Sequence, residues 1–446
     1  MIGYRHIVLV ACVMASHAAR AQVAETVLHA FSGGKDGASP TDTLLIGTDQ
    51  SGALTGLYGT TSSGDANLGC TDGVAGYYCG SVFSLLPPGQ GKTRWKAQLL
   101  YNFTGYADED TPVAGLFSGG GQIGATTPLY GTTLGSEFGY DGSVFMQIGT
   151  TLTTIWNFSA YVDGRYPYGG AITDQSGAVY VPTVFGGAYG CGTVVQLLPP
   201  TPGQMAWSEN ILWNFTGGTD GCNAYSALIE DSAGALYGTT LNGAGSGGVF
   251  KLTPPAAGQT VWTEQMLYGF TGGADGGYPF GTLAFGPGGT LYGTTAAGGA
   301  GYGVVFQLTP PAQGQTAWTE QALYSFTGGA DGAAPLFGAL LIDSNGTLYG
   351  TASGGGAAKK CGGFGTEGGT VFKLTPPAGG QGAWSQSTLF DFPGGHGGCI
   401  PTGGLAADSS GALYGTTEYG GSAKHEACAI TGCGTVFRLT GTGFTP

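Results

Sequence analysis

Hydrophobic positions along this chain come in short runs separated by turn-forming residues. In the stretch 337–392, four runs rich in β-branched and aromatic residues are each bounded by Gly, Pro, Asp or Asn, and they cover 337–343, 347–351, 370–375 and 384–392. Runs of this length with such boundaries are typical of β-strands. The pattern therefore predicts four short strands within one stretch of sequence.

The same arrangement recurs seven times, centred on the motif Leu-Tyr-Gly-Thr-Thr or a variant of it. The central tyrosines are Tyr58, Tyr130, Tyr180, Tyr237, Tyr292, Tyr349 and Tyr414. Each motif is followed by a Gly-rich loop, Val-Phe-x-Leu or a variant, and a further strand that in most units begins with Trp. Seven repeats of four strands predict an all-β fold, a seven-bladed β-propeller with four-stranded blades. A parallel β-helix has shorter rungs, and a sandwich would not repeat seven times.

The two ends of the repeat array complement each other. Residues 25–31 form a lone strand of the outer type before the first unit, and the seventh unit stops after its third strand, 435–440. We expect these two strands to pair and close the ring, which removes two exposed sheet edges. Residues 22–446 are thus predicted to form a single propeller domain.

The Leu-Tyr-Gly-Thr-Thr … Gly-x-Val-Phe-x-Leu-Thr units resemble the tandem repeats of bacterial extracellular GloVer, or choice-of-anchor, repeat proteins. The resemblance covers essentially all of 25–440. It implies extracellular placement and a propeller-like fold, and it implies no established activity.

Composition agrees with a folded, turn-rich chain. Glycine supplies 91 of the 446 residues and charged residues only 9%, yet hydrophobic residues are 41% and aromatic residues 12%. That apolar content is enough to build a core, and the glycines lack the three-residue period of collagen.

Residues 1–21 have the form of a secretory signal peptide, with a polar start, an apolar stretch from Ile7 to Ala15 and the cleavage motif Ala19-Arg20-Ala21. A lipoprotein signal with Cys12 as the lipidated residue is the alternative. No other segment has the length and apolarity of a transmembrane helix. We therefore expect an exported protein, in the periplasm, outside the cell or on its surface.

The net charge of the chain limits the classes of molecule that it is expected to bind. The formal net charge is −14, and removal of 1–21 would take away Arg5 and Arg20, leaving 11 basic and 27 acidic residues, or −16. An acidic chain of this kind disfavours nucleic acid and anionic membranes as partners.

Eight cysteines follow Cys12, an even number that suits disulfide bonding in an exported protein. Aligned repeats place Cys191 and Cys222 in neighbouring loops, and Cys361 and Cys399 in the same two kinds of loop elsewhere in the ring. Two further pairs would close within their own loops, and the predicted bonds are Cys70–Cys79, Cys191–Cys222, Cys361–Cys399 and Cys428–Cys433.

The connections of a four-stranded blade divide between two faces. The outer-to-inner connections and the second-to-third loops share one face, called the top face, and the Asp-x-x-Gly and Pro-Pro-x-x-Gly-Gln turns lie on the bottom face. Three second-to-third loops are long, 62–80, 352–369 and 418–434, and they belong to neighbouring units one, six and seven. Variable loops on a rigid scaffold often carry function, so these loops form a candidate functional rim; tolerated insertion is the alternative.

Candidate catalytic residues lie on this rim. His396 replaces the Asp of most other units, and His425 stands beside Glu426, so that the three could serve as acid–base catalysts or hold a metal ion. Three lysines are candidates for holding an acidic sugar or another anion: Lys359, Lys360 and Lys424. The competing interpretation for all of them is a solvated polar loop.

Aromatic residues follow the repeated Asp-Gly step and are predicted near the channel mouth. They are candidates for stacking on sugar rings or, alternatively, for packing the inner strands together: Tyr166, Tyr168, Tyr225, Tyr278, Phe280 and Phe337. The repeated Asp residues suit calcium as oxygen ligands, although Asp before Gly is ordinary turn chemistry. No other cofactor is evident, and the recurrent Trp residues are expected to pack the blades.

Together these features predict an exported binding or interaction module with a glycan or cell-surface polymer as ligand at the top face. The alternatives are a polysaccharide lyase or glycosidase that uses the histidine site on the rim of blades six, seven and one, and a structural surface protein. Because propellers host both binding and catalysis, the fold alone leaves enzymatic activity undecided.

Overall fold

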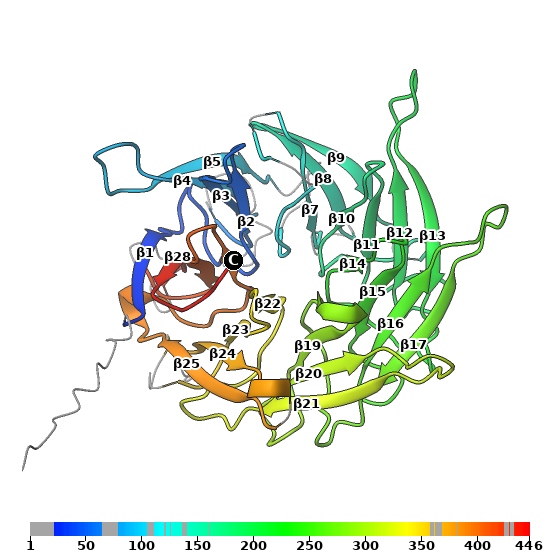
Figure 1. Ribbon diagram of the computed structural model, residues 1–446. Coiled ribbons are helices and arrows are strands. Elements are labelled where there is room, and N and C mark those ends of the chain that lie inside the picture. The colour runs from blue at the N-terminus through cyan, green and yellow to red at the C-terminus, as the bar shows by residue number, and fades with distance from the viewer. Residues whose placement is uncertain are drawn as a thin grey trace, which may run out of the picture.

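The computed structural model describes residues 22–64, 79–104, 111–119, 122–124, 126–135, 141–159, 161–356, 361, 368–380, 382–422, 428 and 432–446. Within these residues seven antiparallel sheets of four strands each stand around a central axis (Figure 1). The predicted seven-bladed β-propeller is confirmed.

Each of the first six blades takes its four strands in chain order, from the axis outward. Blade one is β2 (Leu45–Thr48), β3 (Leu54–Thr61), β4 (Ser81–Leu86) and β5 (Lys96–Asn102). Blade two is β6 (Phe117–Ser118), β7 (Leu129–Thr133), β8 (Ser143–Ile148) and β9 (Thr151–Asn157). Blade three is β10 (Ile172–Thr173), β11 (Val179–Pro182), β12 (Thr193–Leu198) and β13 (Ser208–Asn214).

The next three blades repeat this order. Blade four is β14 (Ile229–Glu230), β15 (Leu236–Thr240), β16 (Gly248–Thr253) and β17 (Thr263–Gly269). Blade five is β18 (Ala284–Phe285), β19 (Leu291–Thr295), β20 (Val304–Thr309) and β21 (Thr319–Ser325). Blade six is β22 (Leu341–Ile342), β23 (Leu348–Ala352), β24 (Thr370–Thr375) and β25 (Ser385–Asp391). Short 3-10 turns cover Pro287–Gly289, Ala378–Gly380 and Gly395–Gly397.

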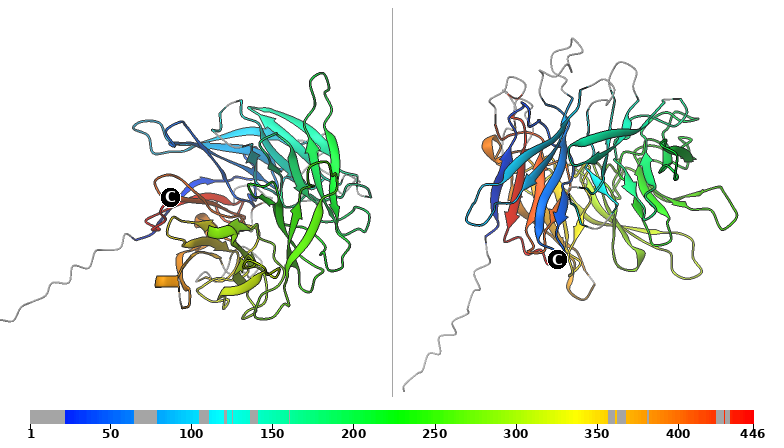
Figure 2. Two further views of the ribbon diagram at one scale, coloured as in Figure 1. Left: turned by 45° about the vertical axis from the view of Figure 1, so that its right-hand side comes forward. Right: turned by 90° about the horizontal axis from the view of Figure 1, so that it is seen from above.

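Blade seven is built from both ends of the array. It contains β26 (Ala406–Ala407), β27 (Leu413–Thr417), β28 (Thr435–Thr440) and, as its outer strand, β1 (Ala24–Ala30). Strand β1 pairs antiparallel with β28 from Ala24 opposite Thr440 to Ala30 opposite Thr435, with a bulge between Val27 and His29. The two strands lie side by side in Figure 1, and Figure 2 shows the same closure from two further directions. The predicted ring closure is confirmed.

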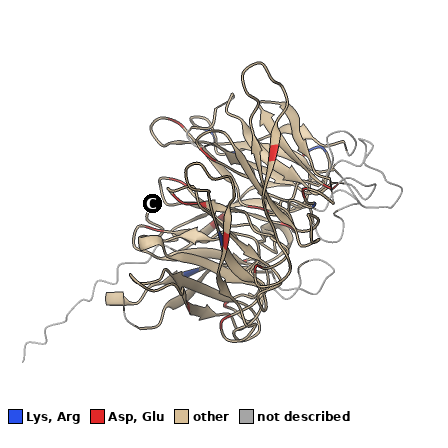
Figure 3. Cartoon of the chain, turned by 90° about the vertical axis from the view of Figure 1, so that its right-hand side faces the viewer, with Lys and Arg blue, Asp and Glu red and all other residues tan. Residues whose placement is uncertain are grey.

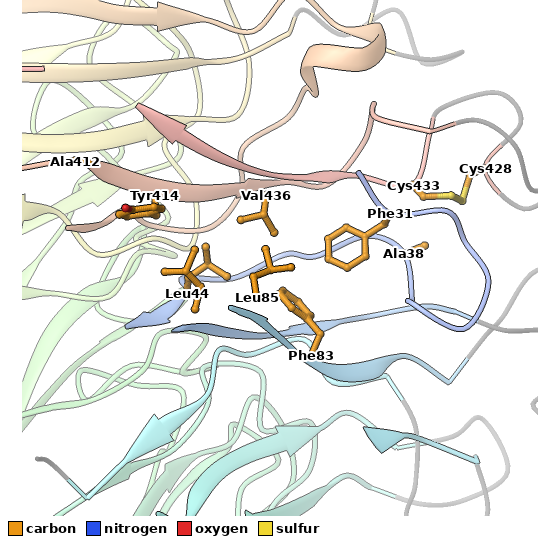
Figure 4. Packing of buried hydrophobic residues seen from close by; sticks show 11 residues of the cluster. Phe31, Ala38, Leu44, Phe83, Leu85, Ala412, Tyr414, Cys428, Cys433 and Val436 are labelled. Carbon is orange, nitrogen blue, oxygen red and sulfur yellow. A yellow bond between two sulfur atoms is a disulfide. The ribbon is translucent and has the colours of Figure 1, made fainter. Parts of the chain in front are cut away.

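The hydrophobic core lies between blades. At six of the seven seams a Phe at the end of the outer strand meets the Phe of Val-Phe in the next blade. Phe31–Phe83 is the pair across the closing seam, with ring centroids 5.1 Å apart. The same contact recurs at 5.1 Å for Phe215–Phe250. Between blades two and three, Phe158 packs in a cluster with Val195 instead. Figure 4 shows this packing around Phe31 and Phe83, with Val436 and Leu85 beside them and Tyr414 farther along the same cluster. Because every core cluster joins two blades, a blade is stabilised mainly by its neighbours.

The Leu-Tyr-Gly-Thr-Thr motif has a separate task at each position. In blades three, four, six and seven its Tyr hydroxyl donates a hydrogen bond to the Asp of the bottom turn, as from Tyr414 to Asp408 at 2.7 Å. Its first Thr donates to a backbone carbonyl of the next blade, as from Thr60 Oγ1 to Ala114 at 2.9 Å. The motif therefore ties the second strand both to its own turn and to the adjacent blade.

The glycine of the motif leaves space for the core Phe. A Cβ atom on Gly131 would lie 2.3 Å from Phe145 Cζ, and one on Gly415 would lie 2.5 Å from Phe437 Cζ. These rings are held on their other side by the preceding blade, as in Phe103–Phe145 at 5.3 Å. Close packing requires glycine where this ring is Phe; in blade three the position holds Val181, and the residue opposite it is Val195.

The inner strands are shorter than the sequence pattern indicates. Residues 337–343 are predicted as a strand, whereas β22 contains only Leu341 and Ile342. Around the axis the chains approach too closely for regular pairing, since a Cβ on Gly338 would lie 2.3 Å from Gly404 Cα. The residues before each inner strand therefore form an axial lining without strand pairing.

Charged residues are sparse over the whole ring, as Figure 3 shows from one side. Ion pairs between two described residues include His29–Asp36 at 3.2 Å and Lys251–Asp231 at 3.8 Å. The fold is held by apolar and hydrogen-bonded contacts, with little contribution from paired charges.

Candidate functional site

The two kinds of top-face loop meet as predicted. Backbone bridges join Ala38 to Ser63, Cys222 to Asn242 and Cys399 to Tyr419, which in each case connects an outer-to-inner connection with a second-to-third loop. Both kinds of loop therefore share one face of the ring.

Four aromatic side chains converge on the axis and form what we call the axial aromatic cluster: Tyr168, Tyr225, Phe280 and Phe337. Ring centroids are 5.3 Å apart for Tyr168–Tyr225, Tyr225–Phe280 and Tyr168–Phe337, and 5.5 Å apart for Phe280–Phe337. The contact between Tyr168 of blade three and Phe337 of blade six crosses the ring. The four rings thus contact each other across the axis of the ring.

The other two aromatic candidates lie elsewhere. Tyr166 packs against Phe185, with centroids 6.1 Å apart, and beneath the guanidinium of Arg165. Tyr278 is 44% exposed and has a left-handed backbone with φ of 58°. The structure therefore brings four of the six predicted aromatic residues together and leaves Tyr278 free to face solvent.

The axial lining carries one carboxylate that the sequence interpretation missed. Asp42 accepts hydrogen bonds from the backbone N–H groups of Thr43, at 2.5 Å, and of Gly115 in blade two. It lines a cavity of about 10 Å³ with Tyr168, Tyr225 and Phe337, space for about one water molecule. Burial raises the pKa of Asp42 to about 6, although the two backbone hydrogen bonds lower it.

Aligned repeats could have revealed Asp42. At its position other units have small residues, such as Gly169, Ser226, Gly281 and Gly403. Small residues fit because the blades touch at this level, and a Cβ on Gly403 would lie 2.5 Å from the Asp42 backbone. Asp42 departs from that rule and joins blade one to blade two.

A second carboxylate, Glu418, lies at the top of blade seven. Burial raises the pKa of Glu418, while its hydrogen bond with Tyr419 lowers it. Burial, together with the nearby charges of Glu418 and Asp42, raises the pKa of Tyr168 to about 12. The axis near the top face is therefore a partly buried, acidic and aromatic environment.

Exposed tyrosines occupy the top-face loops of blades three and five. Tyr161 and Tyr278 lie on the connections that lead into these blades and are 93% and 44% exposed, and Tyr189 and Tyr302 lie on their second-to-third loops and are 63% and 47% exposed. Of these four, only Tyr278 belongs to the predicted set. The other three fall outside the repeat motif, so no pattern selects them before their exposure is known.

The repeated Asp of the Asp-Gly step is a turn-capping residue. Asp220 accepts hydrogen bonds from Thr216 N at 2.9 Å, Thr216 Oγ1 at 2.5 Å and Trp213 Nε1 at 3.3 Å. The same capping recurs at Asp275 and Asp331. These contacts give the residue a structural role, and calcium remains an untested candidate ligand. No group of three or more His, Cys, Asp or Glu side chains suited to a metal ion occurs within the described ranges.

His396, which replaces this Asp in unit seven, is exposed in the 3-10 turn Gly395–Gly397. The other proposed catalytic residues, His425 and Glu426, and the candidate lysines Lys359, Lys360 and Lys424 lie outside the described residues. Their grouping with His396 therefore stays a prediction.

The recurrent Trp residues pack between blades, as predicted. Trp207 of blade three lies edge-on to Tyr130 of blade two, with centroids 6.3 Å apart, and Trp262 of blade four lies in the same way against Tyr180 of blade three. These contacts account for the recurrence of Trp without a ligand.

Three of the four predicted disulfides are present. Cys191–Cys222 and Cys361–Cys399 join top-face loops, and Cys428–Cys433 closes a short loop in blade seven. Cys79 is also disulfide-bonded, and its predicted partner, Cys70, lies outside the described residues. Alignment of the repeats was therefore sufficient to assign the two long-range pairs.

The fold and its motifs define a seven-bladed propeller of tandem repeats. Two overlapping stretches, residues 119–364 and 170–429, match the Gloeobacter/Verrucomicrobia repeat. The chain belongs to this family of repeat proteins. No curated protein matches it.

Solved structures are similar only at low identity. A protein from Thermus thermophilus described as an oxidoreductase (glucose dehydrogenase) is 18% identical with a TM-score of 0.41, and the match covers 74% of this chain and 96% of that one. A gluconolactonase from Xanthomonas campestris is 15% identical with a TM-score of 0.37, covering 71% and 82%. A protein from Bacteroides uniformis described as a 6-phosphogluconolactonase is 13% identical with a TM-score of 0.44, covering 77% and 83%. At these values the similarity says nothing about the function of this chain.

No helix among the described residues is long and apolar enough to cross a membrane.

Proposed function

We propose that this protein is an exported binding module that holds a glycan on its top face. The observation that carries the proposal is the exposure of four tyrosines, Tyr161, Tyr189, Tyr278 and Tyr302, all on top-face loops of blades three and five. A tyrosine ring offers an apolar face to the C–H groups of a sugar, and its hydroxyl group can donate or accept a hydrogen bond.

The axial aromatic cluster has a different role in this proposal. Its rings contact each other with centroids 5.3–5.5 Å apart, and in this proposal they hold one another in place while the exposed tyrosines contact the sugar. Their packing holds the inner ends of blades three to six at fixed positions. The exposed tyrosines are therefore presented from a rigid base, which lowers the entropic cost of binding.

Export is supported by two kinds of observation. Disulfides such as Cys191–Cys222 persist in oxidising compartments, and residues 1–21 have the form of a secretory signal. A secreted or surface-bound location would bring the top face to extracellular glycans.

The test is a binding screen of the purified protein against soluble polysaccharides, followed by calorimetry on the best ligand. We expect Tyr189→Ala and Tyr302→Ala each to weaken binding by about tenfold, the value of a lost contact of roughly 1.4 kcal/mol. Met205→Ala is the matched control, since Met205 is 96% exposed on a bottom turn. If Met205→Ala weakens ligand binding as much as the tyrosine variants do, the top-face tyrosines are not the site. If the protein releases cleaved polysaccharide, it is an enzyme and not only a binding module.

A further inference from the structure

A groove recurs on the bottom face where one blade meets the next. Between blades three and four it has a volume of about 710 Å³, and one wall is formed by Gln196 and Asn210 of blade three. The other wall is formed by the bottom turn of blade four, which includes Val261 and Trp262. Gln196 stands between Asn210 and Tyr180 in the strand register, so these three side chains share one face of the sheet.

The groove where blade seven meets blade one follows the same plan with different chemistry. Thr26, Arg438 and Tyr414 take the cross-strand positions of Asn210, Gln196 and Tyr180. On the opposite wall, Arg94 and Trp95 take the positions of Val261 and Trp262. We call this space, of about 480 Å³, the seam groove. The positions that hold the neutral residues Gln196 and Val261 in the groove between blades three and four therefore both hold arginine in the seam groove.

Neither arginine is neutralised within the part of the chain that the structure describes. Arg438 stacks over the Tyr414 ring at 5.8 Å, and its Nε atom is buried without a hydrogen-bond partner. At the same repeat position Lys251 forms an ion pair with Asp231 at 3.8 Å, and neither Arg94 nor Arg438 forms one among described residues.

The one carboxylate in the seam groove is already occupied. Asp408 accepts hydrogen bonds from Ser410 N at 2.8 Å, Ser410 Oγ at 2.6 Å, Ala412 N at 3.1 Å and Tyr414 OH at 2.7 Å. Oδ1 accepts the three bonds from Ser410 and Ala412, and Oδ2 accepts the bond from Tyr414, so both oxygens hold the turn. The single negative charge of Asp408 stands against two arginines, which leaves the lining of the groove with a net positive charge.

We propose that the seam groove is a binding site for an acidic saccharide, with Arg94 and Arg438 holding a sugar carboxylate and Trp95 contacting the ring. Guanidinium groups pair with carboxylates through parallel, charge-assisted hydrogen bonds. The groove is larger than a single inorganic ion requires and lies within the size range of small-molecule sites. The hydroxyl groups of Thr26 and Thr93 supply hydrogen-bonding partners for sugar hydroxyls.

This site is separate from the proposed top-face site, since it lies on the bottom face and uses other residues. The net charge of −14 disfavours long, densely charged polyanions. A saccharide with one carboxylate per sugar fits two arginines in an otherwise acidic protein.

The test uses tetragalacturonate as the probe and a neutral galactose tetrasaccharide as the comparison, both measured by calorimetry on the full-length protein. Arg94→Val and Arg438→Gln introduce the residues found in the groove of blades three and four, so both are compatible with this fold. We expect each to weaken tetragalacturonate binding about tenfold or more. Lys373→Gln is the charge-matched control, since Lys373 holds the repeat position of Arg438 in blade six.

If Arg94→Val binds tetragalacturonate as tightly as the unchanged protein, the proposal is overturned. Arg94 is exposed, so its replacement removes no packed side chain and should leave the fold intact. Equal loss of tetragalacturonate binding in Lys373→Gln would also overturn the proposal by showing a general charge effect. So would an equal effect of Arg94→Val on binding of tetragalacturonate and of the neutral tetrasaccharide, because the arginine would then not be recognising a carboxylate. Arg94→Val should leave binding through Tyr189 and Tyr302 unchanged, which separates this outcome from failure of the top-face proposal.

Discussion

At the scale of single residues, this protein depends on side chains that are small where blades meet. Gly131 shows the constraint most clearly, because its missing Cβ would lie 2.3 Å from the buried ring of Phe145. The ring cannot move aside, since Phe103 of the preceding blade packs against it.

We expect Gly131→Ala to lower the free energy of unfolding by about 1–3 kcal/mol, the usual cost of overpacking a core. The measurement is thermal or denaturant unfolding followed by circular dichroism. Gly89→Ala is the matched control, because nothing lies within 4 Å of a Cβ at that position. Similar losses in the two variants would contradict the close-packing explanation.

Paired carboxyl groups make a second residue-scale prediction. Glu209, Glu264 and Glu320 occupy the same place on outer strands, each beside the capping Asp of an adjacent loop. Burial and that neighbouring Asp raise the pKa of each Glu from 4.5 to about 7. The native protein therefore keeps a proton that the unfolded chain has lost between these two pH values.

Stability should consequently fall as the pH rises from about 4.5 to about 7, because the native state binds more protons in that range. We expect that replacing Glu209, Glu264 and Glu320 together with Gln will reduce this pH-dependent loss in the free energy of unfolding. The expected reduction is about 1 kcal/mol per residue, after allowance for solvent screening. Melting temperatures between pH 4.5 and 8 provide the measurement. Blade six is a natural precedent, since Gln386 stands at this position and donates to the Asp331 carbonyl at 3.3 Å. A melting temperature that rises over this range in the unchanged protein would refute the assignment.

At the scale of elements, the sequence predicted most strands well because the repeat supplies seven versions of the same pattern. Strand β24 has the predicted bounds of 370–375, and β25 differs from the predicted 384–392 by one residue at each end. The inner strands were predicted too long, because blade-to-blade contact at the axis leaves only Leu341 and Ile342 paired in β22.

Disulfides connect elements and should stabilise them according to the length of chain that they close. Replacing Cys191 and Cys222 with Ala opens a loop of 31 residues and should cost about 3–4 kcal/mol, whereas replacing Cys428 and Cys433 opens a loop of 5 and should cost about 2 kcal/mol. Parallel chemical denaturation of the two variants under non-reducing conditions measures the difference. A larger loss for Cys428 and Cys433 would argue against the loop-closure explanation.

At the scale of the whole molecule, the ring is closed by the pairing of β1 with β28. Removal of 22–32 would expose the edge of β28 and strip one side of the cluster that contains Phe31 and Phe83. We expect the melting temperature to fall sharply, by roughly 10 °C or more, because blades are stabilised mainly by their neighbours.

Calorimetry of the shortened protein checks this expectation. A synthetic peptide of 22–32 added in trans should restore part of the lost stability, and a scrambled peptide of the same composition should not. If the shortened protein melts at the original temperature, ring closure by β1 does not stabilise the fold.

The sequence by itself determined the number of blades, the closing strand and the long-range disulfides, because repetition turns weak local signals into a strong one. Only the tertiary structure decided which residues meet across the axis and across the closing seam. Tyr168 and Phe337, or Arg94 and Arg438, belong to distant parts of the chain, and their contact or shared groove depends on ring curvature and blade spacing. Their joint role arises from that geometry, which no local pattern encodes.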